Sequence, residues 1–161
     1  MNVMLCVIGN GGKKDKKRNR RTNEMAVVEQ LLCEGEGGAI NFGNHLLDAK
    51  AKVEDFPCCG DLYKVKTFKS MTKLEKNGMF LYESVPGTSV NGFKETDQGI
   101  TFKVEGTEDA QLTVGLKEDT EYEVFVGGES IGKMKTNLGG KLSLGVEFNS
   151  SDAVDVKVVE V

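Results

Sequence analysis

Apolar and polar residues alternate over three short runs in the last third of this chain, between residues 98 and 161. Successive side chains of a β-strand point to opposite faces, so alternation with a period of two predicts strands that bury one face. The alternating apolar residues are Ile100, Phe102, Val104, Leu112, Val114, Leu116, Leu142, Leu144, Val146 and Phe148.

Turn sequences separate these runs and predict further strands. Gly127-Gly128 is a two-residue hairpin connection between residues 121–126 and 129–136. Residues 137–140 and 149–152 predict turns before strands at 141–148 and 154–161. Upstream, residues 61–69 and 79–85 also alternate, and the second run ends at the turn dipeptide Pro86-Gly87.

The beginning of the domain is less regular. Residues 25–34 and 39–42 predict a hairpin around a glycine-rich turn, although the first of them also suits a helix, and residues 45–56 suit either structure. About ten short strands indicate an all-β antiparallel sandwich or barrel. Two small β subdomains, residues 25–97 and 98–161 with a seam near 95–99, are the alternative.

Residues 1–24 differ in charge from the rest of the chain. They hold seven basic and two acidic residues, which gives a net charge of +5. Because the whole chain has a net charge of −4, the remaining residues carry −9. A basic arm before an acidic domain is typical of nucleic-acid binders. However, Arg20-Arg21 can be encoded as a bacterial ribosome-binding sequence three codons before Met25. We therefore expect translation to start at Met25, which mass spectrometry of the native N-terminus would test.

The sequence predicts a cytoplasmic protein without a membrane partner. No apolar run approaches the roughly 20 residues that span a bilayer. A secretory signal has basic residues before its apolar stretch, whereas here the apolar residues 3–8 come before the basic cluster.

The four cysteines and the single histidine are the candidate metal ligands. Without an export signal, Cys6, Cys33, Cys58 and Cys59 are expected to be reduced thiols. Cys58-Cys59 is a vicinal pair and lacks the two intervening residues of a zinc-binding CxxC. A site built from Cys33, His45 and this pair is therefore disfavoured, and we predict no metal or cofactor. His45, at the start of a strand, is expected to be polar surface.

Charged residues in the strands also predict no catalytic site. Most carboxylates alternate with apolar residues, which places them on the solvent face; they are Glu83, Glu105, Glu108, Asp109, Glu121 and Glu123. A basic stretch around Tyr63 and Phe68 is interpreted as a solvated strand face that protects a sheet edge, so a nucleic-acid partner is not expected. Its lysines are Lys64, Lys66, Lys69, Lys73 and Lys76.

Residues 116–124, with Tyr122 near their end, resemble the tyrosine corner of fibronectin type III and related sandwiches. The resemblance implies that the Tyr122 hydroxyl bonds back to the chain a few residues upstream. The proline common in that family is replaced by Glu118, and the chain has no tryptophan for the family's buried position.

A broader resemblance connects residues 25–161 with a family of short, uncharacterised bacterial β-rich proteins, some of which are labelled endosialidase. It implies a small cytoplasmic β protein. An enzyme acting on sialic acid must hold a carboxylate, for which arginine is suited, and this chain has no arginine after Arg21. The segments that carry the resemblance are 25–31, 60–67, 74–80, 82–88 and 131–137.

The leading hypothesis is a non-enzymatic binding or structural protein that self-associates through exposed strand edges. Segments 25–34 and 154–161 are the candidate edges, with the valines of the second serving the core or an interface. The alternative is a carbohydrate-active enzyme or carbohydrate-binding module, which requires a cleft that gathers Tyr82, Glu83 and other carboxylates. A nucleic-acid binder that uses residues 1–24 is the third hypothesis.

Overall fold

A computed structural model describes residues 31–148 and 153–161, and these form thirteen strands and one 3-10 turn, η2 (Glu36–Gly38). The predicted all-β class is confirmed, with more strands than the ten or so expected. The strands are β1 (Leu32–Glu34), β2 (Ile40–Phe42), β3 (Ala51–Cys58), β4 (Asp61–Phe68), β5 (Met71–Lys76), β6 (Met79–Val85), β7 (Ser89–Thr96), β8 (Gly99–Glu105), β9 (Ala110–Gly115), β10 (Glu121–Val126), β11 (Glu129–Lys135), β12 (Lys141–Val146) and β13 (Val154–Glu160).

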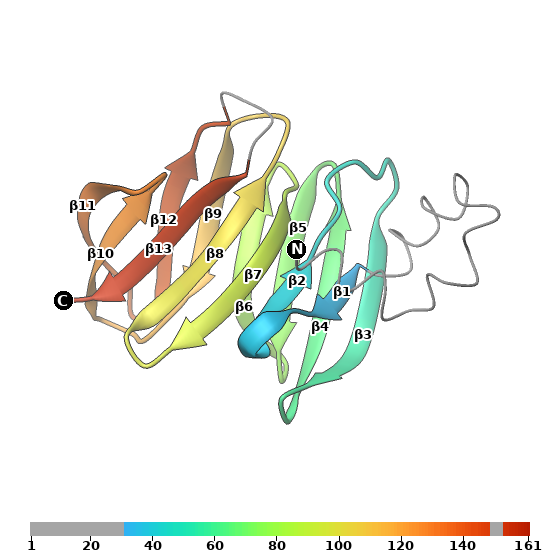
Figure 1. Ribbon diagram of the computed structural model, residues 1–161, viewed down its shortest axis with the longest axis horizontal. Coiled ribbons are helices and arrows are strands. Elements are labelled where there is room, and N and C mark those ends of the chain that lie inside the picture. The colour runs from blue at the N-terminus through green and yellow to red at the C-terminus, as the bar shows by residue number, and fades with distance from the viewer. Residues whose placement is uncertain (1–30, 149–152) are drawn as a thin grey trace.

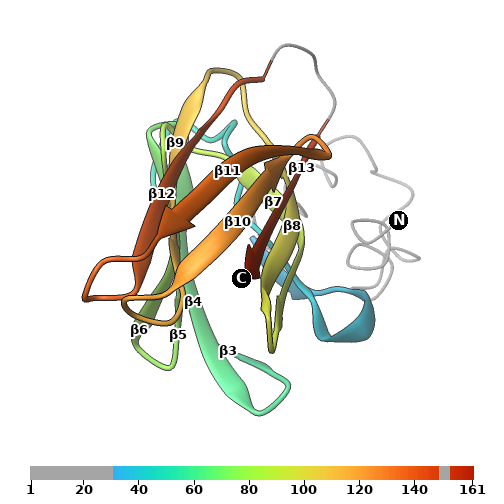
Figure 2. The same ribbon diagram turned by 90° about the vertical axis from the view of Figure 1, so that its left-hand side faces the viewer.

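The strands form two sheets that pack face to face as a sandwich (Figure 1). One sheet has seven strands in the order β1-β2-β7-β8-β13-β10-β11, and the other has six in the order β12-β9-β6-β5-β4-β3. All strand pairs are antiparallel. Figure 2 shows the two layers side by side, so the sandwich forms rather than the barrel.

The inward faces of the strands build one hydrophobic core. In β8, β9 and β12 the buried residues alternate with outward ones, as the period of two predicted. Phe42 and Phe102 each pack edge-to-face on the ring of Tyr82, with centroids 5.2 and 5.6 Å apart. Such aromatic pairs contribute about 0.5–1.5 kcal/mol each beyond the area that they bury.

Residues 154–161 were wrongly expected to form a sheet edge. Strand β13 pairs with β8 on one side and with β10 on the other, so it lies inside the seven-stranded sheet. Val156 and Val158 are buried there, whereas Val161 is exposed. Among the described strands, the edges are β1 and β11 in one sheet and β3 and β12 in the other. The described part of segment 25–34, strand β1, is therefore an edge as expected.

The seam expected near residues 95–99 falls in the β7–β8 hairpin of the seven-stranded sheet. Both sheets combine strands from before and after this turn. In the ambiguous stretch 45–56, turns and bends occupy residues 45–49 and β3 begins at Ala51.

Several expectations concern residues outside the described part of the chain. They are the arm of residues 1–24, the start at Met25, the first residues of segment 25–34 and the turn at 149–152. No helix among the described residues is long and apolar enough to cross a membrane.

Candidate functional site

A groove of about 430 Å³ opens at one end of the sandwich, between the two sheets. Strands β5, β6, β9 and β12 contribute to it from one sheet, and β7, β8 and β10 contribute from the other. We call it the end groove. Its floor is formed by Phe80, Leu81, Ile100, Leu116 and Tyr122, and its rim by Lys76, Glu95, Asp97, Lys117 and Lys141.

The floor of the end groove is apolar and closely packed. Leu81, Ile100 and Tyr122 are buried, and Phe80 is half-buried beneath Lys141, whose Nζ lies 4.5 Å from the ring centroid. At Gly115 a Cβ would lie 2.6 Å from the carbonyl oxygen of Phe80, so the missing side chain lets β9 approach β6 closely here.

The tyrosine corner forms one wall of the end groove. The backbone N–H of Lys117 donates a hydrogen bond to the Tyr122 hydroxyl at 3.1 Å, which is the upstream contact expected for Tyr122. The Lys117 ammonium pairs with Glu160 of β13 at 2.8 Å, and this contact raises the pKa of Lys117. The β9–β10 loop is thus attached to the sheet by both its backbone and its side chain.

Charges on the rim are nearly balanced. Lys76 Nζ lies 2.6 Å from Glu95 Oε1, and this ion pair joins β5 of one sheet to β7 of the other. Exposed pairs of this kind stabilise proteins by at most about 1 kcal/mol. Asp97 and Lys141 add one charge of each sign. The groove therefore combines an apolar floor with donors and acceptors of both charges around it.

The residues that a glycan cleft required do not come together. Tyr82 is fully buried, and its hydroxyl is hydrogen-bonded to Thr88 at 2.7 Å. Tyr63 and Tyr122 are also buried, so none of the three tyrosines presents a ring for stacking on a sugar. Glu83 pairs in register with Lys73 and Thr113, away from the end groove.

Carboxylates elsewhere on the strands are dispersed. Glu105 pairs in register with Ser89, and Glu123 accepts a hydrogen bond from the Ser130 hydroxyl at 2.7 Å. Glu108 and Glu121 are exposed, and Asp109 accepts the backbone N–H of Phe148. These contacts belong to strand pairing and turns, as the alternation predicted.

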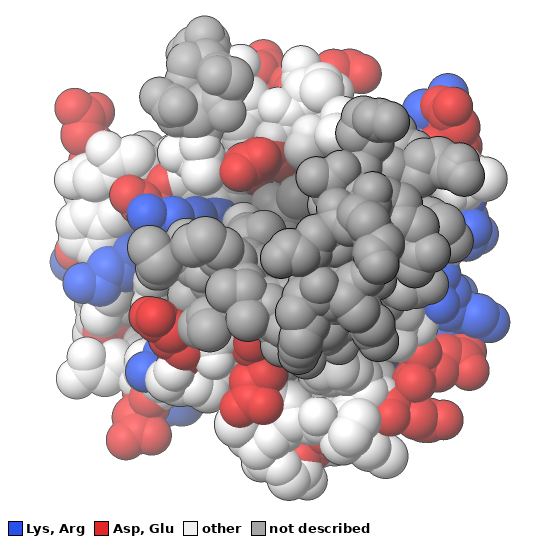
Figure 3. Space-filling view, turned by 45° about the vertical axis from the view of Figure 1, so that its right-hand side comes forward, with Lys and Arg blue, Asp and Glu red and all other residues white. Residues whose placement is uncertain are grey.

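The basic stretch lies on β4 and β5, which are interior strands of the six-stranded sheet. The expectation that it protects a sheet edge is therefore wrong. Lys64 pairs with Glu54 of β3 at 3.7 Å, and Lys73 pairs with Glu75 at 3.5 Å. Figure 3 shows basic and acidic side chains interspersed over the visible described surface rather than separated by sign. The two ion pairs partly neutralise the basic stretch, and the described surface visible in Figure 3 lacks the uniform positive field that attracts phosphates.

His45 is half-buried rather than simple polar surface. Its Nδ1 lies 2.6 Å from the hydroxyl of Ser89, and the same hydroxyl accepts its backbone N–H at 3.2 Å. Burial lowers the pKa of His45, while the charge of Glu105 acts in the opposite direction. The contact fixes the loop before β3 on the first residue of β7.

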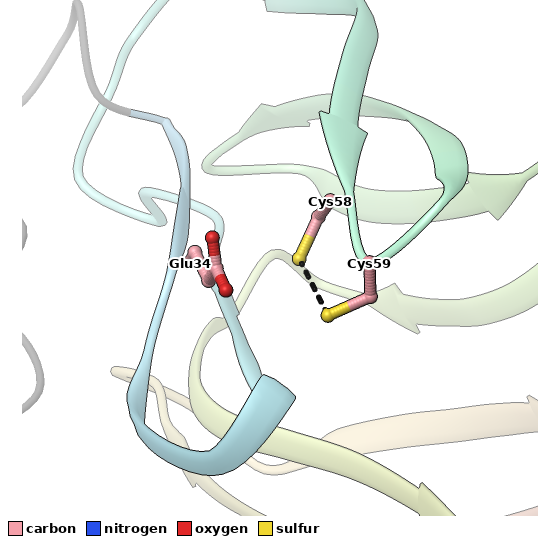
Figure 4. Close-up of side chains that lie close together, drawn as sticks. All are labelled: Glu34, Cys58 and Cys59. Carbon is pink, nitrogen blue, oxygen red and sulfur yellow. Dashed lines mark hydrogen bonds between the residues drawn. The ribbon is translucent and has the colours of Figure 1, made fainter.

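The vicinal thiols lie where β3 meets the β3–β4 turn. Cys58, the last residue of β3, is buried, and Cys59, the first residue of the turn, is exposed. Their Sγ atoms are 3.6 Å apart (Figure 4). The pKa of Cys58 is raised to about 12. Burial is the main cause, followed by the Cys59 thiol and the charges of Glu34 and Asp61. His45 and Cys33 do not belong to this group, but Glu34 does. Cys33 is disulfide-bonded, so the expectation that it is a reduced thiol is wrong, whereas Cys58 and Cys59 are free as expected.

Glu34 and the end groove are the features that sequence reasoning missed. Glu34 lies on a different hairpin from Cys58, and no local spacing connects the two residues. For the groove, the available signal was the tyrosine-corner segment itself, because it places a loop at this end of the sandwich. Comparison with family models, with curated proteins and with solved structures finds no match for this chain.

Proposed function

We propose that this protein is a non-enzymatic binding protein that takes a small amphipathic ligand in the end groove. The observation that carries the proposal is the half-buried ring of Phe80 beneath Lys141, in a groove of about 430 Å³. Ligand sites in proteins typically enclose about 300–1,000 Å³ and combine apolar walls with a few polar groups. The apolar part of the ligand would contact Phe80, and its polar part would contact Asp97, Lys117 or Lys141.

The proposal is tested with the amphipathic anion 1-anilinonaphthalene-8-sulfonate, whose fluorescence rises in apolar surroundings. Lys141→Glu reverses the charge above Phe80 and is expected to weaken binding by about tenfold, because unit charges a few ångströms apart interact by about 1 kcal/mol in water. Lys66→Glu on β4 is the matched control and should leave binding unchanged. Equal affinity of both variants, or NMR shifts away from the groove, would contradict the proposal.

A carbohydrate-active role is the second candidate, at a different place from the Tyr82 and Glu83 cleft that the sequence required and that does not form, because the rim of the end groove carries the carboxylates of Glu95 and Asp97. It predicts that sialylated or other oligosaccharides shift the NMR signals of these two residues. Double replacement by Glu95→Gln and Asp97→Asn should then abolish glycan binding or hydrolysis. If glycans leave the groove signals unchanged while the anilinonaphthalene probe moves them, the carbohydrate role is excluded.

Self-association is part of the proposal, and β11 is now the edge that supports it. Six of its seven residues are exposed, and it pairs only with β10 among the described strands. An unpaired edge can add a strand of another chain. Light scattering should then give a discrete oligomer, and Ile131→Lys should dissociate it; a monomer at all concentrations would exclude it.

A cytoplasmic location belongs to the same proposal. The free thiols of Cys58 and Cys59 support it, since such compartments keep thiols reduced, while the disulfide-bonded Cys33 counts against it. Fractionation of the cells that express the protein would test it.

A further inference from the structure

The turn between β3 and β4 holds its two cysteines in an unusual backbone conformation. Cys59 and Gly60 form the two-residue connection, and both have a positive φ, 54° and 87°. This is the primed geometry that suits right-handed strand twist, and its first position usually carries asparagine, aspartate or glycine. Cys59 is therefore a non-glycine residue at positive φ, which is uncommon. The result is that the Sγ atoms of Cys58 and Cys59 lie side by side, 3.6 Å apart.

A carboxylate from the opposite sheet completes the cluster. Glu34 ends β1, the edge strand of the seven-stranded sheet, while Cys58 ends β3, the edge strand of the six-stranded sheet. The two edges lie at the same end of the sandwich (Figure 1). One ligand atom from each of Glu34, Cys58 and Cys59 lies within 4.8 Å of the others. The turn η2 passes beside them, since a Cβ on Gly38 would lie 3.6 Å from Cys59 Sγ.

The spacing of the sulfurs matches a tetrahedral metal. With zinc–sulfur bonds of about 2.3 Å and a tetrahedral angle, two thiolates lie about 3.8 Å apart, close to the observed 3.6 Å. Two-coordinate linear binding would separate them by about 4.6 Å, twice the same bond length, which this turn does not provide. A carboxylate oxygen is a normal third ligand for zinc, and water can fill a fourth position.

We propose that Cys58, Cys59 and Glu34 form a binding site for one divalent cation of the zinc class, which connects the edges of the two sheets. Binding forms two metal–sulfur bonds and one metal–oxygen bond, and the two thiol protons pass to solvent. No oxidation occurs.

The test uses the full chain, reduced with a phosphine and stripped of metal with a chelator. Competition between the protein and a chromophoric chelator for Zn²⁺ should give one ion per chain. Substitution by Co²⁺ should give a thiolate-to-metal charge-transfer band that reports two sulfur ligands. Zn²⁺ should also raise the thermal unfolding midpoint, because a ligand that binds only the folded state stabilises it.

Variants distinguish the proposed ligands from their neighbours. Cys59→Ser changes an exposed residue, so the fold should survive, and the affinity should fall by more than the roughly 10- to 100-fold that loss of a supporting group costs. Glu34→Gln should weaken binding while the charge-transfer band persists. Glu36→Gln, two residues away on η2, and the Cys6→Ser/Cys33→Ser double variant are controls that should bind Zn²⁺ like the unchanged chain.

Three results would overturn the proposal. The first is that Zn²⁺ does not bind with unit stoichiometry to the reduced chain. The second is that Co²⁺ binds without thiolate bands. The third is that Cys59→Ser retains both affinity and thermal stabilisation while the Cys6→Ser/Cys33→Ser variant loses them, which would place the metal on other thiols. None of these results bears on the end groove, so the two proposals fail independently.

Discussion

The hydroxyl group of Tyr122 links the β9–β10 loop to the seven-stranded sheet through the backbone N–H of Lys117. This contact was predictable because donor and acceptor are five residues apart and the segment resembles a known motif. The cluster of Glu34, Cys58 and Cys59 was not predictable in this way. Its members come from two hairpins, and only the packing of the sheets determines that they meet.

Tyr122→Phe is expected to destabilise the fold by about 1 kcal/mol, because a partly buried hydrogen bond is lost and the Lys117 N–H remains without its partner. Urea denaturation of the purified protein measures the change. Tyr63→Phe is the matched control: that tyrosine is also buried, and its hydroxyl makes no hydrogen bond among residues 31–148 and 153–161. An equal loss in both variants would show that the ring, not the hydrogen bond, matters at Tyr122.

His45 is expected to make stability depend on pH. Burial lowers its pKa in the folded state, so the unfolded chain takes up a proton at higher pH, near about 6.5. Stability from this residue is therefore fully present above that value and is lost as the pH falls through the lower folded pKa. His45→Gln should flatten the decrease in unfolding free energy between about pH 7 and pH 5. Parallel curves for both proteins would contradict this assignment.

At the scale of elements, alternation predicted the strands that bury one regular face, and irregular strands were missed. Strand β5 turns Thr72 and Leu74 inward, so a polar side chain interrupts the apolar pattern. Strand β7 contains a register shift between Asn91 and Lys94, and Gly92 has a φ of 67°. The order of the strands in each sheet could not be predicted from alternation, because alternation identifies the buried face of a strand but not its neighbours. That is why β13 was expected at an edge.

Thr72 joins three elements through its hydroxyl. The group contacts the Thr67 hydroxyl at 2.8 Å, donates to the carbonyl oxygen of Thr88 at 2.7 Å and accepts the Thr88 N–H at 3.1 Å. Each buried group left without its partner costs about 1–3 kcal/mol. Thr72→Val should therefore lower the free energy of unfolding by about 2–4 kcal/mol in a urea titration.

The same substitution at Thr113 is the control for Thr72. Thr113 also lies in the six-stranded sheet, but its hydroxyl contacts Ser143 in an exposed position, at 3.0 Å. Water can replace that bond, so Thr113→Val should cost well under about 1 kcal/mol. If the two variants lose similar stability, the buried hydroxyl network is not an important contribution to the fold.

For the whole molecule, strand pairing makes the two halves of the chain dependent on each other. Strand β8 pairs with β7, and β9 pairs with β6, across the seam that the sequence suggested at residues 95–99. A fragment of residues 98–161 should therefore show no cooperative unfolding transition by circular dichroism, while the full chain shows one. A cooperative transition in the fragment would mean that residues 98–161 fold as a separate unit.

The burial of all three tyrosines, in a chain without tryptophan, has a spectroscopic consequence. Light at wavelengths that excite only tryptophan produces no emission from this protein. Any peptide or protein partner that contains tryptophan can therefore be titrated against the unlabelled chain, and every change in its fluorescence belongs to the partner. Tyrosine emission of the chain alone, measured before a partner is added, reports whether the core between the sheets is intact.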